Sequence, residues 1–185
     1  MNKKMIFFKT NIFESILFKP KKFSDERGFF SETWNDKQFN SILGKKINFV
    51  QDNFSRSKKN IIRGLHYQVK KPQGKLVRVS NGSVYDVIVD LRASSPTFKS
   101  WFGVKLSSYN RNILWVPPGC AHGFVTLTNS ADFLYKTTEY WFPEYEKCIL
   151  WSDKTLNINW FIKGKPFLSD KDKMGTSLQK AEFYK

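Results

Sequence analysis

Short segments that alternate in polarity between turns are the feature that most limits what this chain can fold into. In the segment 83–91, the apolar or aromatic residues 85, 87, 89 and 91 lie on one face of a strand, while the other face alternates apolar side chains with Asp86 and Asp90. Two inward carboxylates are costly unless they have polar partners. Further strands are expected over 76–80, 101–106, 113–116, 123–128 and 133–140. The sequence therefore predicts an all-β sandwich or barrel.

One helix is expected before these strands. Asn35 is a good N-cap, Gln38 stands at the third helical position of a capping box, and apolar residues at 39, 42 and 43 share a face before Gly44. The tail beyond residue 153 carries Ile158, Trp160 and further aromatic residues, so we expect it to pack back on the strands. Residues 1–185 are accordingly predicted to form a single domain.

Composition bears on partners and compartment. The net charge is +15, but the lysines are scattered through turns and no nucleic-acid module is recognisable, so we expect no nucleic-acid partner. No run approaches the roughly 20 apolar residues of a membrane helix, and Lys9 interrupts the basic start before a signal-peptide core develops. Two cysteines, Cys120 and Cys148, fit free thiols in a reducing compartment. These observations predict a cytoplasmic protein with no membrane partner.

The two histidines of the chain lie in similar glycine-rich settings. His66 belongs to the segment 63–68, and His122 to the segment 117–124, which has the Pro-x-Gly-x-x-His spacing of the second cupin motif. The first segment resembles the start of the first cupin motif, His-x-His, but Gln68 replaces its second histidine. Loss of an imidazole ligand weakens a metal site, so we expect no metal and no cofactor.

A set of motifs in fixed order resembles one family along nearly the whole chain. The chain is similar to dTDP-4-dehydrorhamnose 3,5-epimerases in the segments 25–32, 50–55, 62–68, 74–79, 86–92, 95–98, 119–124, 134–138 and 168–172. The resemblance implies a cupin-type jelly-roll β-barrel with a few short peripheral helices, assembled as a homodimer. It also implies conversion of dTDP-4-dehydro-6-deoxy-D-glucose to dTDP-4-dehydro-L-rhamnose.

The chemistry of this reaction suits the residues present. Protons on the carbons beside a ketone are acidic, so inverting those centres needs a base on one face, an acid on the other and positive charge near the enolate oxygen. His66 suits the base, because an imidazole is largely neutral near pH 7. The resemblance implies that Asp172 orients His66 and that Tyr135 donates the proton.

The resemblance also implies the substrate-binding residues. Arg63 and Lys75 are the natural cations for an enolate, sugar or phosphate oxygen, and His122 is a second polar contact that Asp86 is placed to orient. At Trp141 the chain departs from the tyrosine common in the family, which leaves an aromatic ring able to stack on thymine. The full expected set is Arg27, Phe30, Glu32, Gln51, Asn53, Arg63, Lys75, His122, Trp141, Glu146 and Lys171.

Three alternatives remain open at the level of sequence. A related epimerase can invert a single centre or act on a GDP-linked or heptose sugar. A non-catalytic cupin that binds a sugar nucleotide needs no acid and base together. A metal-dependent cupin oxygenase or isomerase is disfavoured by Gln68.

Overall fold

Two β-sheets packed face to face form the body of the molecule. The structure is a computed structural model and describes residues 5–162 and 164–185. One sheet has the order β1-β2-β10-β7-β12-β5, and the other the order β13-β6-β11-β8-β9. The strands of the first sheet are β1 (Ile6–Lys9), β2 (Ile16–Lys19), β10 (Ile113–Val116), β7 (Lys75–Asn81), β12 (Ser130–Thr137) and β5 (Gln51–Lys58). Those of the second are β13 (Glu146–Cys148), β6 (Ile62–Gln68), β11 (Cys120–Thr126), β8 (Ser83–Asp90) and β9 (Trp101–Ser107).

The space between the sheets is filled by alternate residues of both. Val84 and Ile88 of β8 are fully buried there with Val77 of β7 and Leu114 of β10. The opposite face of β8, including Val87 and further apolar residues, belongs to a second buried cluster outside the five-stranded sheet. The predicted alternation in the segment 83–91 is therefore confirmed, and so is the all-β class; the two sheets form a jelly-roll β-barrel.

The two inward carboxylates of β8 have partners, as burial requires. Asp86 contacts the ring of His122, and Asp90 accepts hydrogen bonds from Arg92, Ser95 and Thr97. Burial alone would raise the pKa of Asp90, but these hydrogen bonds outweigh it and lower the pKa below the ordinary value of the carboxyl.

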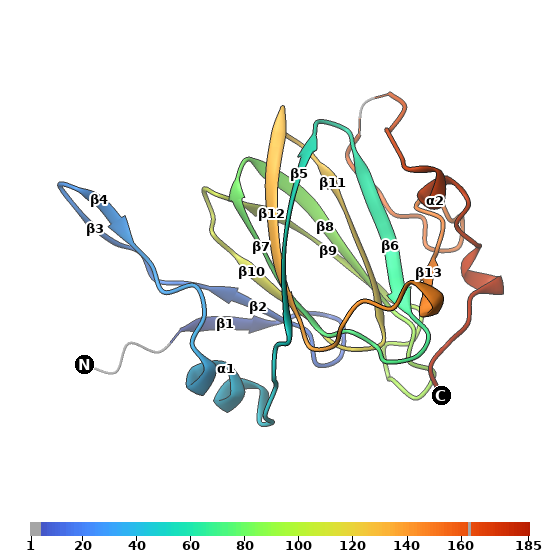
Figure 1. Ribbon diagram of the computed structural model, residues 1–185, viewed down its shortest axis with the longest axis horizontal. Coiled ribbons are helices and arrows are strands. Elements are labelled where there is room, and N and C mark those ends of the chain that lie inside the picture. Colours follow the sequence, from blue (N-terminus) through green and yellow to red (C-terminus); the bar gives the residue numbers. More distant parts are fainter. Residues whose placement is uncertain (1–4, 163) are drawn as a thin grey trace.

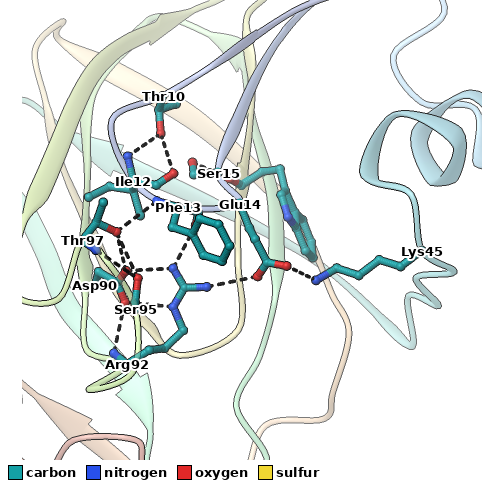
Figure 2. A network of polar contacts seen from close by, with 11 residues as sticks. Thr10, Ile12, Phe13, Glu14, Ser15, Lys45, Asp90, Arg92, Ser95 and Thr97 are labelled. Atoms are coloured by element: carbon teal, nitrogen blue, oxygen red, sulfur yellow. Dashed lines mark hydrogen bonds and ion pairs between the residues drawn. The ribbon is translucent and has the colours of Figure 1, made fainter.

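The polar cluster around Asp90 and Arg92 also attaches the N-terminal segment to the barrel. Arg92 also donates to the Phe13 carbonyl and to Glu14, and Glu14 in turn pairs with Lys45 at 2.6 Å, just after the helix (Figure 2). Phe13 N donates to Thr97 at 3.0 Å. The turn between β1 and β2 is thereby tied both to the end of β8 and to the segment that follows α1 (Asp36–Leu43).

Two outer layers cover the sheets. Helix α1 packs Phe39 against Phe18 and Trp115 on the outside of the six-stranded sheet. Asn35 accepts a hydrogen bond from Gln38 N at 3.1 Å and Gly44 ends the helix at φ 67°, as predicted. The Gln38 side chain does not complete the capping box, because its oxygen accepts from Met5 N instead.

The C-terminal tail forms the other layer. Leu156, Trp160 and Leu178 are buried against the outer face of the five-stranded sheet, which confirms that this segment packs back on the barrel. It contains helix α2 (Asp170–Lys173), which lies beside β6 (Figure 1), and a 3-10 turn at Leu178–Lys180; another such turn, Pro143–Tyr145, precedes β13. Phe161 and Phe167 of the same tail are largely exposed.

A short hairpin projects away from the barrel. It consists of β3 (Phe23–Asp25) and β4 (Gly28–Phe30), and Figure 1 shows it standing apart from both sheets at the left of the view. Phe29 and Phe30 are 58% and 69% exposed. Within residues 5–162 and 164–185, no helix has the length and apolarity that a membrane crossing requires.

The predicted strands outside segment 83–91 are confirmed with small differences at their ends. The strand expected over 113–116 has those bounds, β11 begins three residues earlier than expected at Cys120, and β12 ends at Thr137 rather than at residue 140.

Candidate functional site

The two histidines lie side by side on neighbouring strands. His66 of β6 and His122 of β11 are direct antiparallel partners. The strands approach closely beside them, because a Cβ atom on Gly64 would lie 2.6 Å from Gly123 Cα, and one on Gly123 would lie 2.6 Å from the Arg63 carbonyl oxygen. The glycines of both motifs therefore allow the contact that places the two imidazoles together.

His66 is paired with a carboxylate from the tail. His66 Nε2 lies 2.5 Å from Asp172 Oδ1, although 106 residues separate them. Ser169 Oγ donates to the other carboxylate oxygen at 2.7 Å, and Gly64 N donates to Oδ1 at 3.3 Å. Burial would raise the pKa of Asp172, but the hydrogen bonds from His66, Ser169 and Gly64 lower it. Asp172 is thus held as an oriented anion, which is the contact predicted for it.

His122 has its own carboxylate. Its Nε2 lies 2.9 Å and 3.1 Å from the two oxygens of Asp86, which is fully buried, and its ring stacks on Phe133 at 5.9 Å. The expected contact between Asp86 and His122 is confirmed.

A cavity of about 230 Å³ lies between the two sheets at this point. His66 and His122 line it from the five-stranded sheet, while Lys75 and Tyr135 line it from the six-stranded sheet. Its remaining lining residues are Ser55, Arg63, Gly123, Phe124 and Phe133. Arg63 is held by a hydrogen bond from its Nε to Ser57 Oγ at 2.9 Å. An imidazole and a phenol therefore face one small space from opposite sheets.

Burial changes the acidity of both groups on the six-stranded side. It lowers the pKa of Lys75 to about 8, against which the nearby Glu146 and Asp86 act only in part. Burial also raises the pKa of Tyr135 above its ordinary value. Tyr135 consequently keeps its proton near neutral pH.

A second polar group lies toward β13. Trp141 Nε1 donates to Glu146 Oε2 at 2.8 Å, and Lys171 forms an ion pair with the same oxygen. Gln51 connects this group to β5, because its Nε2 donates to Asn53 Oδ1 at 2.8 Å and its Oε1 accepts from Trp141 N at 3.3 Å. Trp141 itself is 55% exposed.

Three expected residues lie elsewhere. Arg27 belongs to the turn of the β3–β4 hairpin and pairs with Asp25, whereas Phe30 and Glu32 line a different cavity of about 520 Å³ beside the hairpin. Within one chain, the structure does not bring these residues to the cavity that His66 lines.

Gln68 does not face the cavity as a ligand would. Its amide nitrogen donates to the carbonyls of Lys71 and Tyr140, and its oxygen accepts from Phe142 N at 2.8 Å. Gln68 therefore holds together the loops beside β6. Sequence reasoning did not single out Ser169, Phe124 and Phe133; for Ser169, the N-cap pattern Ser-Asp-Lys-Asp was an available signal.

Comparison with known proteins agrees with this arrangement. The family model described as dTDP-4-dehydrorhamnose 3,5-epimerase matches residues 9–180. An enzyme of that name from Salmonella typhimurium is 51% identical, with 96% of this chain and 97% of the relative covered. The crystal structure of a dTDP-6-deoxy-D-glucose-3,5-epimerase from Legionella pneumophila, in complex with dTDP-4-keto-L-rhamnose, superposes with a TM-score of 0.93 at 47% identity. The match covers 96% of this chain and 95% of that chain. The crystal structure of a 3'-monoepimerase from Streptomyces bikiniensis, in complex with dTDP-quinovose, has a TM-score of 0.87 at 28% identity. The match covers 92% of this chain and 86% of that chain.

Proposed function

Because the chain belongs to the dTDP-4-dehydrorhamnose 3,5-epimerase family, we propose that the cavity between its sheets exchanges the protons on both carbons beside the ketone of dTDP-4-dehydro-6-deoxy-D-glucose. The product is dTDP-4-dehydro-L-rhamnose, and the enzyme is an isomerase. The observation that carries the proposal is the placement of His66, with its carboxylate partner, and Tyr135 on opposite sheets around one cavity.

Each inversion needs one proton removed and one added on the opposite face of the sugar ring. His66 removes the proton, and Asp172 holds the imidazole in position and stabilises the imidazolium that forms. Tyr135, whose pKa is raised by burial, retains the proton that it delivers from the other face. Exchange with solvent then restores both groups, so no net proton is consumed.

Charge that develops on the ketone oxygen needs donors already in place. Lys75 and Arg63 line the cavity together with His122, and an ammonium or guanidinium in such a partly enclosed space stabilises an enolate more than it would in water. Asp86 and Ser57 hold His122 and Arg63 in place at the cavity.

The nucleotide is assigned to the group toward β13. The half-exposed Trp141 offers a ring on which thymine can stack, and Gln51 and Asn53 offer amides for its polar edge. Glu146 accepts the hydrogen bond of the Trp141 indole nitrogen, and Lys171, which pairs with Glu146, supplies positive charge near the diphosphate.

Arg27, Phe30 and Glu32 contribute to this site only if they come from a second copy of the chain. The hairpin that carries Arg27 and Phe30 projects from the barrel, and Phe7, Phe8, Phe29 and Phe54 are also exposed. We therefore assign the chain to a homodimer in which each hairpin reaches the partner's cavity. Each copy is a single domain, and a reducing cytoplasm suits its two free, buried thiols.

Mixed dimers test the shared site. Co-expression of an Arg27→Ala chain with a His66→Ala chain is expected to restore turnover that neither variant shows alone, because one of the two sites then receives an intact Arg27 and an intact His66. If the mixture is no more active than the separate variants, the hairpin does not act on a partner.

Proton NMR in deuterated buffer tests the reaction itself. With dTDP-4-dehydro-6-deoxyglucose, deuterium is expected at both carbons beside the ketone with the unaltered enzyme, and at neither with His66→Ala. Exchange at one carbon would make this enzyme a single-centre epimerase, and exchange at none would favour another nucleotide sugar, GDP- or heptose-linked, or a non-catalytic binding protein.

A further inference from the structure

A third potential ligand lies beside the catalytic pair. Cys148 of β13 is the direct strand partner of His66, and its Sγ lies 3.9 Å from Asp172 Oδ1. The nitrogen of His66, the sulfur of Cys148 and the carboxylate oxygen of Asp172 all lie within 4.8 Å of one another. They come from three different elements, β6, β13 and α2, and the latter two side chains are buried.

This donor set is the one that zinc prefers. Zn²⁺ is bound by imidazole nitrogen, thiolate sulfur and carboxylate oxygen, and zinc sites that are not purely structural commonly have three protein ligands and one position open to water. Donors around a metal ligand usually fix its orientation, and Asp172 already has two of them in Ser169 Oγ and Gly64 N. The 26% exposed side chain of His66 leaves an approach from the cavity.

We propose that Zn²⁺ binds between His66, Cys148 and Asp172 and inhibits the enzyme by occupying its base. Binding replaces the hydrogen bond between His66 and Asp172 with bonds to the ion, the ring proton moves to the other ring nitrogen, and the Cys148 thiol releases its proton to solvent. Water takes the fourth position. The inhibition, though not the binding, rests on the proposed function.

Charge balance supports a divalent ion at this point. The thiolate and the carboxylate together carry two negative charges, which neutralise the ion without help from further anions. A thiol that coordinates a metal ion directly is deprotonated by it, so Cys148 would bind as the thiolate. The other cysteine, Cys120, is buried near Arg92 and offers a matched control.

Binding is measured first without turnover. Titration of the purified protein with Co²⁺, a spectroscopic substitute for zinc, is expected to give a near-ultraviolet thiolate-to-metal charge-transfer band at one ion per chain, which Zn²⁺ abolishes. The band should disappear in Cys148→Ser and persist in Cys120→Ser. Absence of the band from the unaltered protein would overturn the proposal, whatever the behaviour of the variants.

Inhibition is then measured by epimerase assay. Zinc chloride should stop turnover reversibly, with recovery on adding a chelator, and Cys148→Ser and Cys148→Ala should need at least about tenfold more zinc. Equal sensitivity of folded Cys148 variants and Cys120→Ser would overturn the proposal. A cobalt band in a protein that lacks epimerase activity would instead retain the metal site and refute the proposed function, so the two failures are distinguishable.

Discussion

Asp172 shows how a single residue depends on contacts from distant parts of the chain. It lies in a four-residue helix, yet its carboxylate contacts His66 and Gly64 of β6 and the capping Ser169. In the sequence it is one of several acidic residues in a charged tail, and nothing in the spacing of 106 residues predicts a pair with His66. Only resemblance to a family could assign this role from the sequence.

Removing the charge of Asp172 should therefore affect catalysis far more than folding. Asp172→Asn is expected to lower kcat by about 10²–10⁴, because an amide favours the wrong imidazole tautomer and cannot stabilise the imidazolium. The control is Asp170→Asn on the same helix, an exposed residue whose carboxylate pairs with the exposed Lys173. Steady-state kinetics measures kcat of both variants. Comparable losses of kcat would show that the integrity of α2, rather than the Asp172 carboxylate, determines activity.

Lys75 should set the basic limb of the pH profile. Burial lowers its pKa from 10.5 to about 8, so its ammonium is lost as pH rises through about 8, and kcat/KM should fall there. The free energy of unfolding should instead rise with pH between about 8 and 10.5, because Lys75 is protonated in the unfolded chain but not in the folded one over this range. Lys75→Arg should move the limb to higher pH, while Lys58→Arg at the exposed end of β5 should leave it in place. An unmoved limb in Lys75→Arg would assign the titration to another group.

At the scale of elements, the sequence predicted strands with a clear apolar alternation, including β7, β11 and β12, and missed strands β5 and β6, whose apolar pattern is absent or interrupted. Strand β5 reads QDNFSRSK, and its inward residues include Gln51, Asn53 and Ser57, while the apolar Phe54 is 61% exposed. Its inward face is therefore polar, and the strand has no apolar alternation to predict it. β6 was missed for a related reason, since Arg63, Gly64 and His66 interrupt its apolar pattern. The hairpin β3–β4 was likewise not predicted, because it has no buried face.

The close approach of β6 and β11 can be tested by one methyl group. Gly123→Ala would place a Cβ 2.6 Å from the Arg63 carbonyl oxygen and 3.1 Å from Gly64 Cα, so the strands must separate. We expect a loss of about 1–3 kcal/mol in the free energy of unfolding and a large loss of kcat, because His66 and His122 move apart. Gly44→Ala, at the end of α1, should cost about 1 kcal/mol through its positive φ and leave kcat unchanged. Denaturant unfolding and kinetics on both variants separate these effects.

At the scale of the whole molecule, the net charge of +15 should act on substrate capture rather than on the chemical step. A strongly basic enzyme attracts an anionic nucleotide diphosphate over distances that salt screens, with a Debye length of about 10 Å at 0.1 M. We expect kcat/KM to fall as sodium chloride is raised while kcat stays constant. A parallel fall in kcat would mean that salt disturbs the site itself.

The position of Asp172 in the C-terminal layer also has a consequence for biosynthesis. Every strand of both sheets lies before residue 149, so the ribosome completes the barrel sequence well before it delivers the residue that orients His66. Because a domain folds as a unit and the tail covers the five-stranded sheet, a nascent chain that already contains both histidines and Tyr135 still lacks the carboxylate that orients His66. Catalytic competence is therefore expected only after synthesis of the whole C-terminal layer, when α2 packs beside β6.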